Sequence, residues 1–151
     1  ALGTIEEVVD SLREDGTAIG ALAITCFRPW PVEEVREALQ AAQRVVVVEK
    51  AFAVGAGGIV GQNVRLALAG LRVEVYDVVA GLGGRPITQA SLRGLFTDVI
   101  EGRMDPRRLH FLDLDTELVE REISRARRGT RPGPHAENML RDLGTVASRS
   151  H

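Results

Sequence analysis

Four consecutive valines, Val45 to Val48, constrain the fold of this chain more than any other part of its sequence. An unbroken run of β-branched residues predicts a central strand covered on both faces, because a half-exposed strand would alternate apolar and polar residues. Patterns typical of amphipathic helices lie on either side of it, at 31–42 and at about 59–69. Strands that alternate with helices across short loops predict a doubly wound, mostly parallel α/β sheet.

The same alternation continues along the chain. A first helix is expected to begin at Thr4, which forms a capping box with Glu7, and to stop at Gly16. Thr88 is expected to cap another helix that runs to about Ile100. Further strands are predicted at 18–27, 71–79 and 109–114, and a last helix at 116–126.

The sequence predicts one α/β domain over residues 1–126. From Arg127 the chain becomes rich in arginine, proline and glycine, so we interpret 127–151 as a linker and tail. The opening Leu2-Gly3-Thr4 is similar to the end of a strand that leads into a capped helix. We therefore expect that the first strand of the sheet is missing and that the sequence is a fragment of a longer chain.

The composition excludes several classes of protein. A formal net charge of −2 supplies no long-range field that would attract nucleic acid or an anionic membrane, so neither is expected as a partner. No apolar run approaches the roughly 18 residues of a membrane-spanning helix, and no signal peptide opens the sequence, so the expected location is cytoplasmic. Cys26 is the only cysteine, which excludes an iron–sulfur cluster or zinc site held by cysteines of this chain.

No catalytic or metal-binding set can be assembled from the sequence. His110 falls in a predicted strand, and no Ser-His-Asp or Cys-His pattern includes any of the histidines. Asp113 and Asp115 share one face of a strand, where a solvated face is a better interpretation than a metal site. We therefore expect no catalytic residue, no metal ligand and no cofactor in this chain.

A glycine-rich loop between a strand and a helix is the first candidate site. Gly55, Gly57, Gly58 and Gly61 lie where a dinucleotide-binding loop would place backbone amides against a phosphate. The spacing is one residue longer than the G-x-G-x-x-G fingerprint, and Val60 stands where that motif has glycine or alanine. We favour a structural loop, and the alternative is a standalone Rossmann-like protein that binds a nucleotide at Gly55–Gly61.

Two tight turns are the other candidates, and both are expected at the carboxyl ends of the strands, where open α/β sheets bind ligands. Gly81, Gly83 and Gly84 precede Arg85 in a turn that only glycine adopts readily at positive φ. The segment Arg28-Pro29-Trp30-Pro31 presents arginine and tryptophan, which are enriched at interface hot spots. Either turn can instead be structural. In that interpretation Arg85 docks on neighbouring carbonyls, and Trp30 packs over the helix that follows it.

Together these turns resemble a known family. The corner Gly81-Leu82-Gly83-Gly84-Arg85-Pro86-Ile87-Thr88 resembles the G-L-G-G-R-x-[VI]-T signature of the 2-oxoacid:ferredoxin oxidoreductases. The segment Arg28-Pro29-Trp30-Pro31 is similar to their R-P-F-P segment, especially that of the pyruvate enzymes, with tryptophan in place of the more frequent phenylalanine. The resemblance covers residues 1 to about 100 and leaves the arginine-rich tail without a counterpart.

This resemblance implies the second domain of the α subunit of a pyruvate:ferredoxin oxidoreductase, with a three-layer fold like the C-terminal domain of transketolase. It implies a parent enzyme that converts pyruvate and coenzyme A to acetyl-CoA and carbon dioxide and reduces ferredoxin. Thiamine diphosphate, magnesium and iron–sulfur clusters would be held by other domains or subunits. For this chain the resemblance implies a structural and interface role, with those domains or subunits as partners and no catalytic residue.

Overall fold

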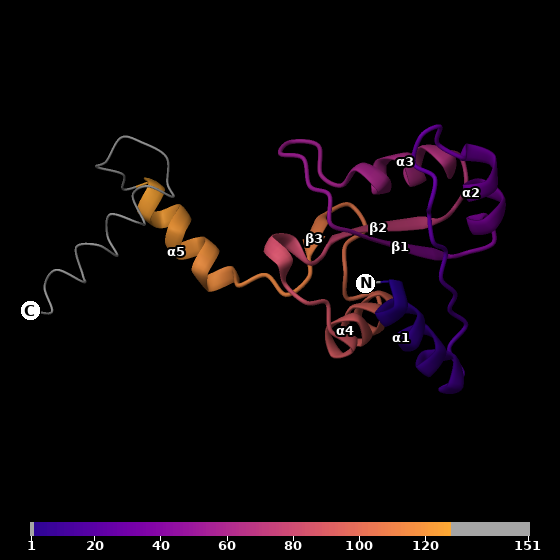
Figure 1. The fold of residues 1–151 in the computed structure, drawn as a ribbon, viewed down its shortest axis with the longest axis horizontal. Helices are drawn as coiled ribbons and strands as arrows, with labels where there is room; N and C mark the ends of the chain where they lie inside the picture. Colours follow the sequence, from indigo (N-terminus) through magenta and orange to yellow (C-terminus); the bar gives the residue numbers. More distant parts are fainter. Residues whose placement is uncertain (1, 128–151) are drawn as a thin grey trace, which may run out of the picture. The chain divides into compact units, whose positions relative to one another are not determined.

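The computed structural model describes residues 2–127 (Figure 1). In chain order the elements are α1 (Leu2–Glu14), α2 (Val32–Leu39), β1 (Arg44–Glu49), α3 (Ile59–Ala67), β2 (Glu74–Val79), the 3₁₀ turn η1 (Leu82–Gly84), α4 (Gln89–Ile100), β3 (Leu109–Phe111) and α5 (Thr116–Arg127). The elements from α1 to β3 belong to one compact unit that ends at Asp113, and α5 belongs to a second unit. Among the described residues, no helix has the length and hydrophobicity that a bilayer crossing requires.

The three strands form one parallel sheet in the order β1-β2-β3. In register, Val47 lies opposite Asp77, and Val79 lies opposite Phe111. Helices α2 and α3 cover one face of this sheet, and α1 and α4 cover the other (Figure 1). The predicted doubly wound, parallel α/β architecture is therefore confirmed, and it agrees with the three-layer fold that the family resemblance implies.

Each face of the sheet carries its own hydrophobic cluster. The first cluster contains Val8, Val9, Leu12, Val78, Leu92, Leu95 and Phe96, and the second contains Val35, Val47, Val64, Ala67, Leu68 and Val75. Val46 and Val48 pack against the first cluster and Val45 against the second, so the valine run of β1 is covered on both faces as predicted. Because each buried aliphatic side chain contributes about 1.5–3 kcal/mol, these clusters hold the helices on the sheet.

Most predicted helix ends are confirmed. After α1, Gly16 adopts a φ of 86°, a left-handed conformation that ends the helix. At the start of α4, the Thr88 hydroxyl accepts a hydrogen bond from the Ser91 N–H at 3.1 Å, so Thr88 is the predicted N-cap. The expected cap at Thr4 is wrong. Helix α1 begins at Leu2, so the backbone at Thr4 is already part of the helix.

The strand expected at 18–27 is also wrong. These residues form neither helix nor strand, and most of their side chains are exposed. A strand exists through backbone hydrogen bonds to a neighbouring strand, and among the described residues no backbone–backbone hydrogen bond reaches 18–27. The Ile19 carbonyl accepts a hydrogen bond from Arg13 Nε instead, and the Phe27 carbonyl accepts one from Arg28 Nη1. The apolar pattern of 18–27 therefore indicates strand propensity, but among the described residues this segment joins no sheet.

Two other strands are shorter than predicted. β2 begins at Glu74 rather than at 71, and β3 ends at Phe111 rather than at 114. The predicted final helix is confirmed as α5. The boundary expected after residue 126 stays a prediction, and of the expected tail at 127–151 all but Arg127 lies outside the described residues.

Candidate interface at the carboxyl edge of the sheet

A buried carboxylate joins the carboxyl end of β1 to the start of α3. Glu49, the last residue of β1, is 8% exposed and accepts hydrogen bonds from the N–H groups of Ile59 and Val60 at 3.0 Å and of Gly61 at 2.9 Å. These donors belong to the first turn of α3, and its N-cap residue, Gly58, has no side chain to bind them. Glu49 is therefore the cap of α3, and the positive end of the helix further stabilises its charge.

Glu49 takes the place that a phosphate would need. The amides that it binds are the donors that a dinucleotide-binding loop offers to its ligand. A Cβ on Gly58 would overlap the Glu49 side chain, and a Cβ on Gly61 would overlap the Asp77 carboxylate. These glycines thus serve the packing of a structural loop, and the alternative prediction of a nucleotide site at Gly55–Gly61 is not supported.

Sequence reasoning missed the role of Glu49. The signal was an acidic residue at the end of an apolar strand, followed by a loop and a helix whose N-cap is glycine. That signal is weak by itself, because the nine residues that separate Glu49 from Ile59 can place the carboxylate anywhere near the sheet edge.

The loop that follows β1 exposes large apolar side chains beyond the end of the sheet. It is closed by a hydrogen bond from the Ala53 N–H to the Gly57 carbonyl at 2.9 Å. Val54, near its tip, is 92% exposed. Phe52 is 42% exposed, although its ring meets that of Phe111 edge to face with the centroids 5.3 Å apart. Apolar side chains in this position are stabilised when a partner covers them.

The predicted glycine turn lies beside this loop, at the end of β2. Gly81, Gly83 and Gly84 have φ values of 70°, 65° and 78°, so the expected left-handed conformations are confirmed. A Cβ on Gly81 would lie 3.1 Å from the side chain of Lys50, the residue that follows β1. The turn at the end of β2 therefore lies against Lys50 at the end of β1, and in Figure 1 the β1–α3 loop and the β2–α4 connection both leave the sheet at its carboxyl end.

Arg85 fixes this turn to the segment after β3. Its Nη1 donates a hydrogen bond to the Asp113 carbonyl at 3.0 Å, which is the docking on a neighbouring carbonyl that the structural interpretation expects. Its side chain is nevertheless exposed, as is Leu82, at 41%, between the glycines. We call the exposed side chains of Phe52, Val54, Leu82 and Arg85 the carboxyl-edge surface.

The second predicted turn, Arg28–Pro31, packs on the face of the sheet covered by α2 and α3. Trp30 contacts the second cluster, and its indole N–H is buried with no hydrogen-bond partner among the described residues. The Phe27 ring meets the indole edge to face at 5.9 Å, and the Arg28 guanidinium lies 4.0 Å from the centre of the same phenyl ring. Within the described residues, no hydrogen bond, ion pair or ring contact joins this turn to Arg85.

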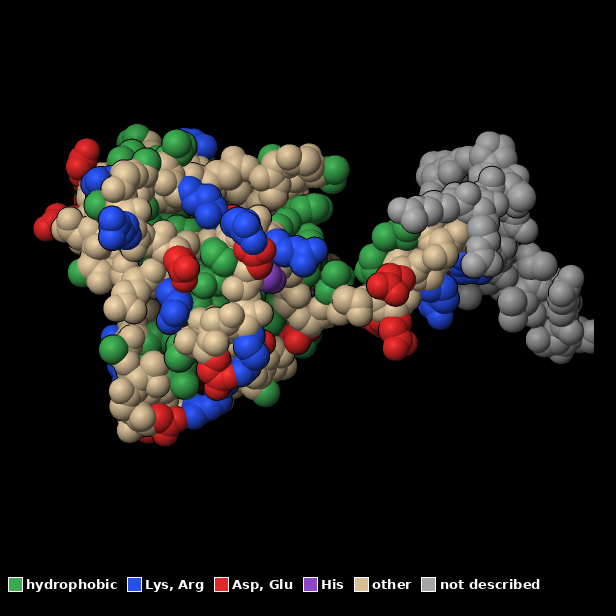
Figure 2. Space-filling view, turned by 180° about the vertical axis from the view of Figure 1, so that it is seen from behind, with side chains coloured by type: hydrophobic (Ala, Val, Ile, Leu, Met, Phe, Trp, Pro, Cys, Tyr) green, Lys and Arg blue, Asp and Glu red, His purple; other side chains and the backbone are tan. Residues whose placement is uncertain are grey.

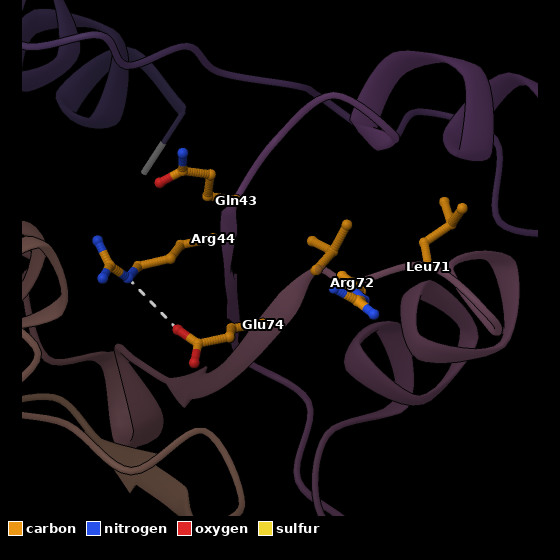
Figure 3. A pocket seen from close by; sticks show the side chains of 6 residues that line it. Gln43, Arg44, Leu71, Arg72 and Glu74 are labelled. Carbon is orange, nitrogen blue, oxygen red and sulfur yellow. Dashed lines mark hydrogen bonds and ion pairs between the residues drawn. The ribbon is translucent and has the colours of Figure 1, made fainter.

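A shallow pocket lies at the opposite, amino-terminal ends of β1 and β2 (Figure 3). There Arg44 and Glu74 form an ion pair, with Nε 3.3 Å from Oε2. Glu74 also accepts the hydroxyl hydrogen of Tyr76 at 2.9 Å, and burial together with this carboxylate raises the pKa of Tyr76. Because open α/β sheets bind ligands at the carboxyl ends of their strands, this internally paired pocket is not a candidate site.

The part of the chain that the structure describes holds no group of three or more histidine, cysteine or acidic side chains that could bind a metal ion. His110 forms a hydrogen bond of 2.8 Å through Nε2 to the Asp105 carbonyl, which is a local structural contact. Figure 2 shows arginines and acidic side chains intermixed with hydrophobic ones on the face turned to the viewer. That face presents no large patch of a single charge that would attract a ligand from a distance.

Comparison with known proteins matches this chain to one family. Residues 1–92 match the family model described as pyruvate:ferredoxin oxidoreductase core domain II. Over 113 residues the chain is 38% identical to the pyruvate synthase subunit PorA of Thermotoga maritima, and this alignment covers 74% of the chain and 29% of that protein. Over 110 residues it is 34% identical to the ketoisovalerate oxidoreductase subunit VorA of Pyrococcus horikoshii, and this alignment covers 69% of the chain and 28% of that protein.

The chain thus spans less than a third of the length of these relatives. The family match includes the Arg28–Pro31 turn and the Gly81–Arg85 turn, and it ends within α4. This extent agrees with the resemblance expected from the two turns. The chain belongs to the pyruvate:ferredoxin oxidoreductase core domain II family.

Proposed function

We propose that this chain is a non-catalytic structural and interface domain of a pyruvate:ferredoxin oxidoreductase. The parent enzyme oxidatively decarboxylates pyruvate in the presence of coenzyme A, forms acetyl-CoA and carbon dioxide, and reduces ferredoxin. Pyruvate is named in the family model and in the Thermotoga maritima subunit, but the relatives also include a ketoisovalerate oxidoreductase subunit, so these similarities do not select the 2-oxo acid. The cytoplasmic location stays a prediction.

The cofactors of that enzyme, which are thiamine diphosphate, magnesium and iron–sulfur clusters, belong to other domains or subunits in this proposal. The residues of this chain do not fit them. An iron–sulfur cluster takes about four cysteine ligands, and Cys26 is the only cysteine here. The amides at the start of α3 that could receive a diphosphate are bound to Glu49. Contacts with coenzyme A and ferredoxin are likewise assigned to other parts of the complex.

The exposure of the carboxyl-edge surface is the observation that carries the proposal. Val54 is 92% exposed, and Phe52 and Leu82 are each more than 40% exposed at the same end of the sheet. Large exposed apolar side chains at one end of a sheet are typical of a surface that a partner covers. The glycine turn and the Arg85 contact with Asp113 hold part of this surface in one conformation, which lowers the entropy that binding would cost.

We therefore propose that another domain or subunit of the oxidoreductase covers the carboxyl-edge surface. Gly83, Gly84 and Arg85 would shape the centre of the contact. Arg28 and Trp30, on the α2–α3 side, are proposed as a further contact, since both are residue types that contribute strongly to interfaces.

Substitution of Val54 by glutamate tests this proposal in the full-length α subunit. A charge at this position has no effect on an exposed loop but would have to be desolvated in the interface, so we expect at least a tenfold loss of association with the partner subunit. The matched control is Leu66→Glu, at the far end of α3, where the leucine is 73% exposed. Size-exclusion chromatography and copurification report assembly, and equal assembly of both variants would refute the proposed contact.

A further inference from the structure

Lys50 is the only lysine of the chain, and it lies beside the carboxyl-edge surface. It directly follows β1, and its side chain is exposed. Lys50 Cε lies 3.1 Å from the place where a Cβ of Gly81 would stand, and the Arg85 carbonyl oxygen lies 3.4 Å from the same place. The stem of Lys50 therefore packs against the glycine turn, close to the backbone of Arg85.

The charges of Lys50 and Arg85 are not neutralised within the described residues. The Lys50 ammonium forms no hydrogen bond or ion pair there. Arg85 donates one hydrogen bond to the uncharged carbonyl of Asp113, and no ion pair joins it to the Asp113 carboxylate or to any other described acid. The carboxylate that precedes Lys50, that of Glu49, is already bound to the amides of α3. Two cations with unused donors thus lie at one end of the sheet.

Elsewhere on the described surface, several arginines pair with a carboxylate of this chain. Arg65 Nη2 lies 2.9 Å from Asp77 Oδ2, and Arg107 Nε lies 3.0 Å from Asp105 Oδ1. Such pairs leave little charge for a partner to recognise. A cation without a carboxylate of its own can instead pair across an interface, where complementary charge selects the partner and fixes its register.

The apolar side chains of the same surface indicate the kind of partner. Val54 is 92% exposed and Leu82 is 41% exposed. A small anion would engage the two cations but leave these apolar side chains in water, whereas a protein surface can cover both. Carboxylates suit the cations well, because the fork of an arginine binds a carboxylate through two parallel hydrogen bonds.

We propose that a partner subunit presents to this surface a segment that combines carboxylates with apolar side chains. A subunit is the chosen partner because the relatives of the chain are named as subunits. The carboxylates pair with the Lys50 ammonium and with the unused N–H groups of Arg85, and the apolar side chains cover Phe52, Val54 and Leu82. This inference rests on the proposed function and specifies the chemistry of the partner.

Charge reversal at Lys50 in the full-length α subunit tests the inference. Lys50→Glu places a carboxylate against those of the partner, so we expect association with the partner subunit to weaken about tenfold or more at low salt. Lys50→Arg keeps the charge and should restore most of the affinity. Lys50→Met keeps the apolar stem beside Gly81, and we expect it to weaken association about threefold and to make the affinity less dependent on salt than in the wild type.

Arg72→Glu is the matched control. Arg72 is likewise exposed and forms no ion pair among the described residues, but it lines the pocket at the amino-terminal ends of the strands. This substitution changes the net charge by the same amount as Lys50→Glu and should leave the affinity within about twofold of the wild type. Urea unfolding identifies any variant that has lost its fold, and Lys50→Met decides the test if Lys50→Glu is such a variant.

The outcomes separate the acidic partner from the proposed interface. If Val54→Glu is defective in assembly while Lys50→Glu and Lys50→Met bind as Arg72→Glu does, the interface stands and the acidic partner is wrong. Tighter binding of Lys50→Glu would also overturn the inference, since the partner would then be cationic. Normal assembly of Val54→Glu and of the Lys50 variants alike would refute the interface itself.

Discussion

At Gly61, α3 packs directly against two carboxylates of the sheet. On one side its N–H binds Glu49, and on the other the Asp77 carboxylate lies where a Cβ would stand. Asp77 is held there by Arg65, whose Nη2 lies 2.9 Å from Oδ2. The absence of a side chain at Gly61 thus allows two carboxylates to pack beneath the same helix, which explains this glycine without reference to a bound nucleotide.

We expect Gly61→Ala to lower the free energy of unfolding by about 1–3 kcal/mol, because the added methyl group must displace Asp77. Gly94→Ala is the matched control, since Gly94 also lies within a helix but has nothing within 4 Å of its would-be Cβ. There the helix propensity of alanine should raise stability by about 0.5–1 kcal/mol. Urea unfolding of both variants measures the difference, and a stabilising Gly61→Ala would contradict the close approach.

Among the elements, α3 depends on a cap that comes from a strand. In α4 the cap is local: Thr88 binds the N–H of Ser91, three residues later, and the sequence predicts it. In α3 the cap is Glu49, which precedes the helix by a whole loop. Local patterns predict the first kind of contact, whereas the second requires the strand and helix to be placed first, and sequence reasoning therefore missed it.

Removal of the Glu49 carboxylate should destabilise the fold more than a lost surface charge does. Glu49→Ala leaves three amides of α3 without an acceptor, and one of them, that of Gly61, is buried. We expect a loss of about 2 kcal/mol in the free energy of unfolding. Glu37→Ala, on the exposed side of α2, should change it by less than about 0.5 kcal/mol. Similar unfolding midpoints for the two variants would mean that Glu49 does not cap α3.

The segment 18–27 marks the limit of prediction at the level of elements. Its apolar sequence has strand propensity, and Ile19 and Ile24 reach the two clusters as a strand would place them. Strand pairing, however, depends on two segments, and the residue pattern of one segment does not identify the segment with which it pairs. The helices were predicted more accurately because their hydrogen bonds and amphipathic faces are set within a few residues, as the positions of Gly16 and Thr88 illustrate.

At the scale of the whole molecule, the described sheet has two edges with different chemistry: the side of β1 away from β2, and the carboxyl ends of the strands. The side edge, at β1 and 18–27, offers backbone groups and apolar faces, which suit a strand. The carboxyl edge offers exposed side chains on fixed turns, which suit a folded partner. The exposed carboxyl edge agrees with the proposed role of an interface domain, in which another domain or subunit covers it.

Arg85→Ala distinguishes a purely structural carboxyl edge from one that meets a partner. The guanidinium makes one hydrogen bond, to the Asp113 carbonyl, and is exposed, so its loss should cost the fold no more than about 1 kcal/mol. We expect association of the full-length α subunit with its partner subunit to weaken at least fivefold, because exposed arginines beside apolar side chains contribute strongly to interfaces. Arg103→Ala is the control. Arg103, which follows the end of α4 in the chain, is also exposed but forms ion pairs with Asp98 and Glu101. Equal affinity of the two variants, measured by titration, would assign Arg85 to the turn alone.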